Sequence, residues 1–213
     1  MAVRRIKFGI GGAVMLAASF ISERGELIVI YLLAALIHEL GHLLAARIMK
    51  IGIERVEFGF SGVRICVDRG LCSYNSEFLL ALFGPLMNFF AIGAALLWAS
   101  VADISYEALI ESGMGYMESG GVGRVGALGF FVIASFAQAA VNLLPVRSLD
   151  GGRILYCAIA MLFGEEAAER VLSVGTAFAA FILWTVALYL MLKVGTGLSI
   201  FVFAVCIFFS CKS

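Results

Sequence analysis

Two histidines and a glutamate stand close together in the apolar stretch from Leu33 to Arg47. His38 and His42 are four residues apart, so on a helix their imidazoles lie on one face, one turn above the other. Two imidazoles so placed can reach one zinc ion at about 2.0–2.1 Å, and Glu39 can hold the attacking water as a general base. These are the chain's only two histidines, so we reject a chance match and predict a zinc centre.

A catalytic zinc has three protein ligands and an open position for water, so one more ligand must come from elsewhere in the chain. Asp150 is the best candidate, because it lies at the end of a broken apolar stretch and its neighbours Gly151 and Gly152 allow close approach. The alternative is that Asp150 caps a helix beginning at Gly151. Cys157 is a weaker candidate ligand.

Three residues near these ligands are candidates for contacts with a substrate: Asn88, Asn142 and Pro145. Asn142 is also a candidate catalytic residue, because its amide can donate a hydrogen bond to a tetrahedral oxyanion. Its alternative role is a hydrogen bond between helices. Asn88 stands deep in an apolar run, where an amide is costly unless it faces the protein interior. Packing or lining a cavity is the more ordinary role of Asn88.

The composition predicts a polytopic membrane protein. Of 213 residues, 62% are hydrophobic and only 14% charged, and the mean hydropathy is +1.05, far from the balance of a soluble domain. The net charge is zero and no basic block occurs, which argues against nucleic acid as a partner. The five cysteines are odd in number and lack metal-ligand spacing, so a disulfide framework is not expected.

The apolar runs predict an all-α protein of about six transmembrane helices in a single domain, 1–213. Residues 26–155 would form a three-helix catalytic core, and the other runs would form scaffold helices at 6–22, 171–192 and 195–211. The first run follows three basic residues, so a signal peptide is the alternative to a helix there. An apolar stretch from about 126 is interrupted between Asn142 and Arg153, and such broken backbone is tolerated only in protein or beside a wet cavity.

Two polar intervals separate the core runs. Residues 53–67 alternate apolar and polar side chains around a Ser-Gly centre, which predicts a β-hairpin at the membrane surface, with an ordinary loop as the alternative. We hypothesise that this hairpin offers an edge strand to an extended substrate. Residues 102–125 are rich in glycine and acids, which predicts a flexible external loop with at most one amphipathic turn.

The positive charges indicate the orientation. Six spans with a cytoplasmic N-terminus place twelve of the fifteen Lys and Arg residues in the cytoplasm and three outside. His42, Asn88 and Asp150 then all lie within roughly ten to twenty ångströms of the cytoplasmic edge, at about 1.5 Å per helical residue. We therefore expect a multi-pass protein of the cell membrane whose N-terminus and active site face the cytoplasm.

Taken together, the motifs resemble the site-2 protease family of intramembrane zinc metalloproteases. The matching stretches are His38-Glu-Leu-Gly-His42, Gly84-Pro-Leu-Met-Asn88 and Asn142-Leu-Leu-Pro followed by Asp150-Gly151. The resemblance implies that His38, His42 and Asp150 bind one zinc ion, that Glu39 is the base and that Asn142 contacts the substrate. It implies cleavage in or near a transmembrane segment of a membrane-tethered regulator, such as a transcription or sigma factor.

About 25 residues separate the second and third spans, so no PDZ domain of the kind many bacterial members carry is expected. The layout is similar to the branch that processes sporulation sigma factors; a CBS domain often follows there, and none is expected within 1–213, whether the chain is a minimal member or part of a longer one. A membrane inhibitor or regulator is a further expected partner.

Two other functional classes compete with a protease. A metal-ion transporter would need several acidic residues along its path, and the helices supply only Glu39 and Asp150, both already placed at one site. A catalytically inactive adaptor is disfavoured, because every residue that the chemistry requires is present.

Overall fold

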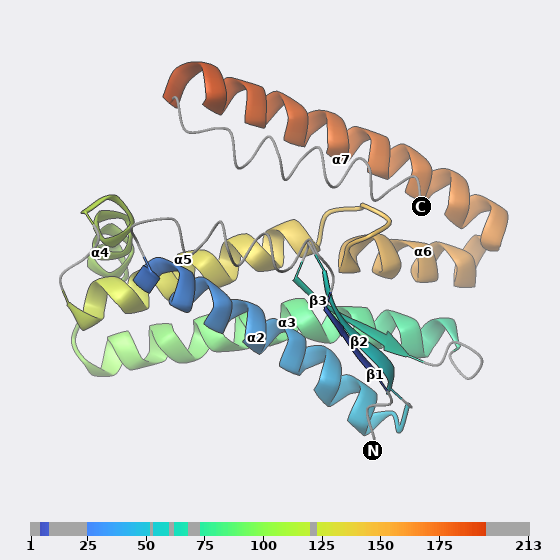
Figure 1. The fold of residues 1–213 in the computed structure, drawn as a ribbon, viewed down its shortest axis with the longest axis horizontal. Coiled ribbons are helices and arrows are strands. Elements are labelled where there is room, and N and C mark those ends of the chain that lie inside the picture. The colour runs from blue at the N-terminus through green and yellow to red at the C-terminus, as the bar shows by residue number, and fades with distance from the viewer. Residues whose placement is uncertain are drawn as a thin grey trace. The chain divides into compact units, whose positions relative to one another are not determined.

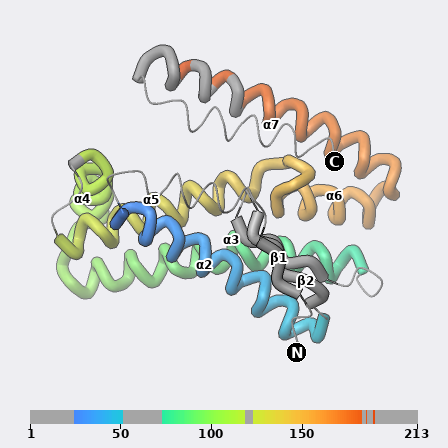
Figure 2. Tube along the Cα trace, in the orientation of Figure 1, coloured from blue at the N-terminus to red at the C-terminus, as the bar shows by residue number. Residues whose placement is uncertain are grey.

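A computed structural model describes residues 5–8, 25–51, 53–59, 62–67, 73–119 and 123–194. Side-chain surroundings are described for 25–51, 73–118, 123–182, Thr185 and Tyr189 (coloured in Figure 2). Figure 1 labels the elements in chain order: β1 (Arg5–Phe8), α2 (Gly25–Ile48), β2 (Ile53–Gly59), β3 (Gly62–Val67), α3 (Tyr74–Val101), α4 (Tyr106–Ser119), α5 (Arg124–Asn142), α6 (Asp150–Phe163) and α7 (Glu165–Val194). The described part of the chain is thus mainly helical, with one small sheet.

Three of the described helices, α2, α3 and α5, are long and apolar enough to cross a membrane. They coincide with the second, third and fourth predicted spans, and the chain is a membrane protein. The expected total of six spans stays a prediction, because 9–24 and 195–213 lie outside the described residues. The expected scaffold helix at 6–22 is wrong at its beginning, since Arg5–Phe8 is a strand.

Contacts divide the chain into two compact units. The first falls in Met1–Leu71 and Phe83–Val141, and the second in Cys72–Leu82 and Asn142–Ser213. The long helix α3 contributes residues to both. The first unit therefore contains α2, the sheet, most of α3, α4 and α5, whereas the second contains α6, α7 and the segment before α6.

In the first unit, α2 crosses α3 (blue and green in Figure 1). The buried residues of α2 recur at helical spacing and so form one face of the helix: Ala34, His38, Gly41, His42, Ala45 and Ala46. Small residues permit the approach, because a Cβ built on Gly41 would lie 2.3 Å from the backbone oxygen of Phe83. Five leucines on the rest of α2 are exposed, which suits a helix that faces lipid: Leu32, Leu33, Leu36, Leu40 and Leu44.

Helix α4 replaces the flexible loop that the sequence predicts for 102–125. Its fourteen residues, Tyr106–Ser119, pack on α5 through two glycines, since a Cβ on Gly113 would lie 2.4 Å from the backbone carbon of Gly129. Leu109 is fully buried at this contact, and the Tyr116 hydroxyl donates to Glu26 Oε2 of α2 at 2.7 Å. The predicted loop is wrong because the glycines of this interval allow close packing between helices.

A three-stranded sheet in the order β1-β2-β3 combines β1, which precedes α2, with β2 and β3, which follow it, and α2 contacts β3. Strands β2 and β3 are antiparallel, with Phe58 opposite Val63 and Gly59 opposite Gly62, in the interval where a hairpin is expected. Strand β1 pairs with β2 in parallel. Because β2 has a neighbour on each side, β1 and β3 are the edge strands of the described sheet. A location at the membrane surface stays a prediction.

In the second unit, the segment 143–149 folds back over the start of α6. A Cβ on Gly151 would lie 2.1 Å from the Leu143 oxygen, and one on Gly152 would lie 2.0 Å from the Val146 oxygen. Gly164 alone separates α6 from α7, with a φ of 86° that favours glycine, and the two helices pack together. The interrupted apolar stretch is thus a true break between two helices, as predicted.

Candidate metal centre

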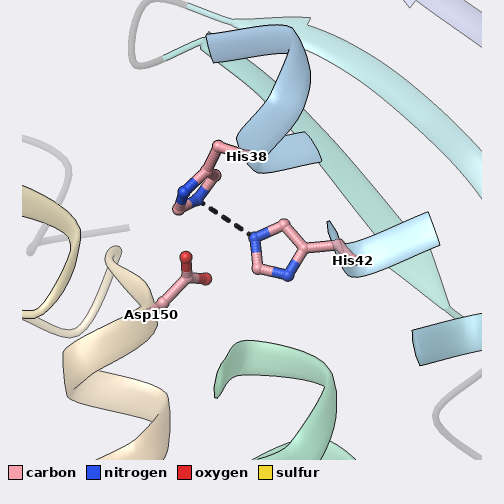
Figure 3. A group of neighbouring side chains, drawn as sticks. All are labelled: His38, His42 and Asp150. Carbon is pink, nitrogen blue, oxygen red and sulfur yellow. Dashed lines mark hydrogen bonds between the residues drawn. The ribbon is translucent and has the colours of Figure 1, made fainter. Parts of the chain in front are cut away.

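The two imidazoles of α2 lie as their spacing predicts. His38 is 3% exposed and His42 9%, and their Nε2 atoms are 3.2 Å apart (dashed line in Figure 3). Two nitrogen ligands at about 2.0–2.1 Å from a tetrahedral zinc ion would be roughly 3.4 Å apart. The pair therefore already stands at close to the separation that one zinc ion requires.

Gly84 of α3 lies directly against these two rings. A Cβ built on Gly84 would lie 2.4 Å from both Cε1 and Nε2 of His42, and 2.8 Å from Nε2 of His38. Glycine at this position therefore allows the two rings to lie this close to α3. Pro85 follows inside the helix and is fully buried.

Asn88, one helical turn after Gly84, is fully buried within the same unit. Its Nδ2 atom is 3.5 Å from His38 Nδ1 and donates to the backbone oxygen of Ser135, on α5, at 3.4 Å. Its side chain is 0% exposed in this structure, and its expected role in substrate binding stays a prediction. Its contacts make it a neighbour of a candidate ligand.

In the second unit, Asp150 is the first residue of α6 and is half-buried. The N-cap position belongs to Leu149, which makes no side-chain capping bond, so Asp150 is not the N-cap residue. Asn142 is the last residue of α5, and Pro145 lies in the segment between the two helices; both are half-buried. The carboxylate, the amide and the proline thus come from one short break in the helices.

His38 and His42 in the first unit, and Asp150 in the second, are residue types that can bind a metal ion. Two imidazoles and one carboxylate are a known ligand set of catalytic zinc, with one position left for water. Glu39 follows His38 on α2 and is half-buried. The residues present therefore fit a zinc centre of the hydrolytic kind.

Cys157, the weaker candidate ligand, has another partner. Its buried thiol lies 4.0 Å from Glu77 Oε2, at the start of α3 and within the same unit. A thiol that donates to a carboxylate keeps its proton, whereas zinc takes the thiolate. Cys157 is thus accounted for without a metal.

The sequence did not predict two groups that form hydrogen bonds to residues near the candidate site. One is the backbone oxygen of Ser135, which no side-chain pattern can reveal. The other is Thr176 of α7, whose hydroxyl accepts from the Arg147 N–H at 3.3 Å and donates to the Pro145 oxygen at 3.2 Å. Thr176 is a polar residue in an apolar helix, and that contrast is the sequence signal that could have identified it.

Comparison with known proteins identifies the family of the chain. A model of peptidase family M50 matches residues 26–186. Stage IV sporulation protein FB of Bacillus subtilis (strain 168) is 29% identical over 136 residues, which cover 63% of this chain and 39% of that protein. The chain therefore spans about two-fifths of the length of that curated relative.

Among solved structures, the site-2 protease from Methanocaldococcus jannaschii is similar in fold, with a TM-score of 0.61 at 20% identity. The similarity covers 100% of this chain and 91% of that one. None of these findings supports the alternative of a metal-ion transporter. Because the family match covers well over half of the residues, the chain belongs to peptidase family M50, the site-2 protease family.

Proposed function

We propose that this protein is an intramembrane zinc metalloprotease that cleaves a peptide bond in or near a transmembrane segment of another protein. The observation that carries the proposal is the His38–His42 pair, buried on a membrane-length helix with Nε2 atoms 3.2 Å apart, in a chain of peptidase family M50. Asp150 would complete the ligand set, since the chain has no third histidine. A bound zinc ion would supply Lewis acidity to the substrate carbonyl and to water.

Residues of the chain itself would carry out the proton transfer and stabilise the oxyanion. Glu39 takes a proton from the attacking water and delivers it to the leaving amide nitrogen. Asn142 donates a hydrogen bond to the developing oxyanion or to the substrate backbone, and Pro145 lines the same segment. The two histidines are buried, which keeps bulk water from these candidate ligands, whereas Glu39 and Asp150 are each half-buried.

The substrate class follows from the setting of the site. A polar centre on a helix that spans the membrane is accessible to a segment that enters from the bilayer, so a membrane-tethered transcription or sigma factor is the proposed substrate. The similarity to a stage IV sporulation protein supports this class. A membrane inhibitor is the proposed regulator, and the cell membrane, with N-terminus and site toward the cytoplasm, is the proposed location.

The test combines metal analysis with cleavage. The wild-type chain, Glu39→Gln and Asp150→Ala are each co-expressed with candidate membrane-tethered factors and then purified without chelators. We expect about one zinc per wild-type chain, zinc retained in Glu39→Gln, zinc lost in Asp150→Ala, and cleavage by the wild type alone. Glu107→Gln is the matched control, because Glu107 is an exposed acid on α4.

Each contrary result has its own meaning. Zinc retained in Asp150→Ala would remove this carboxylate from the ligand set and leave the third ligand to be found. Cleavage by Glu39→Gln at the wild-type rate would overturn the role of the base. Absence of zinc from the wild type would overturn the protease proposal as a whole.

A further inference from the structure

Helix α4 carries two outer stripes of different chemistry. Leu109, Gly113 and Tyr116 form its buried face within the first unit. At about 3.6 residues per turn, an apolar stripe lies directly beside this face, and an acidic stripe lies beyond the apolar one. The apolar stripe consists of Tyr106, Ile110, Met114 and Met117, and the acidic stripe of Glu107, Glu111 and Glu118.

The apolar stripe is open to the surroundings of the described chain. Tyr106, Met114 and Met117 are each about half exposed, and a row of large apolar side chains on one face is unfavourable in water. The acidic stripe is exposed along its whole length. Side by side on one helix, the two stripes suit a boundary between an apolar phase and water.

The contact with α5 indicates how deep α4 lies. Helix α5 has 19 residues, which measure about 28 Å, close to the roughly 30 Å of a hydrocarbon core. It must therefore use its whole length to cross, so Arg124 marks one edge of the membrane. The backbone of α4 meets α5 at Gly129, where a Cβ would lie 2.1 Å from the Leu109 oxygen. Because Gly129 is five residues beyond Arg124, this contact is about 7 Å inside the edge.

The orientation of α4 agrees with this depth. Figure 1 views α4 nearly along its axis, whereas α3 and α5 run across the picture, so α4 crosses both of these membrane-length helices. The Tyr106 hydroxyl forms a hydrogen bond with Ser100 Oγ at 2.8 Å, which fixes the start of α4 to the last turn of α3. Trp98, on the same part of α3, is also exposed. Tyrosine and tryptophan are enriched at the membrane–water interface.

We propose that α4 lies in the membrane–water interface, with its apolar stripe against lipid acyl chains and its acidic stripe toward water. Interfacial helices bury their apolar face about 5–10 Å into this boundary, and the contact at Gly129 is at that depth. Such helices are typically rich in Lys and Arg, which attract anionic lipids. No Lys or Arg occurs between Arg69 and Arg124, so the partner of α4 is the acyl region and not an anionic headgroup.

The experiment asks which molecules touch each stripe. The full chain is placed in nanodiscs of phosphatidylcholine, in which both membrane faces are open to the buffer. The photocrosslinking amino acid p-benzoylphenylalanine replaces Tyr106, Met114 or Met117, one at a time, and replaces Glu107 or Glu111 as matched controls on the acidic stripe. Intact-protein mass spectrometry measures the lipid adduct after irradiation. Irradiation of the same variants in cell membranes, followed by electrophoresis, measures crosslinks to protein.

We expect the yield of lipid adduct to be at least about tenfold higher from the three positions of the apolar stripe than from Glu107 and Glu111. Adducts at both Tyr106 and Met117 would show that the two ends of α4 lie at one depth. Equal yields from the two stripes, or a lipid adduct at one end alone, would overturn the proposal. Crosslinks from Met114 to protein without lipid adducts would indicate a protein docking surface and would overturn it as well.

A second measurement needs no substitution, so it does not depend on the folding of a variant. In wild-type nanodiscs, hydroxyl radicals formed in the buffer should oxidise Met114 and Met117 at least about tenfold more slowly than in a proteolytic digest of the chain. Because both side chains are about half exposed, the protein alone would not protect them to this extent. A water-soluble carbodiimide with glycinamide should modify Glu107 and Glu111 in the same nanodiscs.

Oxidation of both methionines at the rate of the digest, or carboxylates of Glu107 and Glu111 that resist the carbodiimide, would contradict the interfacial position. None of these measurements involves zinc or proteolysis. Failure of this inference is therefore distinguishable from failure of the proposed function.

Discussion

Gly84 of α3 lies against the imidazole of His42, so close that a Cβ on Gly84 would come within 2.4 Å of both Cε1 and Nε2. The same atom would be 2.8 Å from Nε2 of His38. No real Cβ contact is this short, so one added methyl group must displace the two rings or separate α2 from α3. The glycine thus shapes the candidate metal centre without contributing a ligand.

We predict that Gly84→Ala weakens zinc binding at least tenfold and abolishes proteolysis. Gly93→Ala is the matched control on the same helix, because a Cβ there would have no neighbouring atom within 4 Å. The zinc dissociation constant of each variant checks this, with a thermal unfolding curve to confirm folding. A Gly84→Ala protein with wild-type zinc affinity would show that the rings are not held at this position.

The segment that carries Pro145 is held by Thr176 of α7, through the Arg147 N–H and the Pro145 oxygen. Arg147 also pairs with Glu169 of α7. We predict that Thr176→Val lowers the free energy of unfolding by about 1–2 kcal/mol, at about 1 kcal/mol for each lost hydrogen bond, and reduces cleavage. Thr176→Ser should restore both.

Thr185→Val is the control for Thr176→Val, because the Thr185 hydroxyl bonds only within its own helix, to the Phe181 oxygen, among the described residues. Unfolding in detergent and cleavage of a co-expressed substrate give the two measurements. Equal effects of the two valine variants would show that the bonds to the Pro145 segment have no special role.

Close packing of α4 on α5 depends on glycine. A Cβ on Gly129 would lie 2.1 Å from the Leu109 oxygen, whereas one on Gly115 would meet nothing within 4 Å. We predict that Gly129→Ala destabilises the protein by about 1–3 kcal/mol through overpacking, and that Gly115→Ala stabilises it by about 0.5–1 kcal/mol through reduced backbone entropy. Thermal unfolding of both variants checks the opposite signs.

The hydrogen bond from Tyr116 to Glu26 predicts a pH dependence. This bond, and then burial, raise the pKa of Tyr116 above its usual value near 10. A raised pKa means that the contribution to stability is full below about pH 10 and is lost as the pH rises through the folded-state value. The melting temperature of the wild type should therefore exceed that of Tyr116→Phe below pH 10, and the difference should narrow above it. A difference that widened with pH would contradict the assigned bond.

Sequence reasoning succeeded where the physics is local. Helical periodicity alone places His38 and His42 on one face, and a run of apolar residues alone predicts a membrane-length helix. The interruption between Asn142 and Asp150 was equally visible, because polar and helix-breaking residues gather there within an otherwise apolar stretch. These features depend on spacing and residue type within one segment.

Packing between segments decided what the sequence left open. The glycines of 102–125 predicted a loop, but they allow α4 to pack on α5, since whether a glycine loosens a chain or admits a neighbouring backbone depends on that neighbour. Asn88 could have faced a substrate or another helix, and only tertiary structure placed it beside His38 and the backbone oxygen of Ser135. The sequence by itself determined the chemistry of the candidate centre; the tertiary structure decided which buried groups hold its ligands in place.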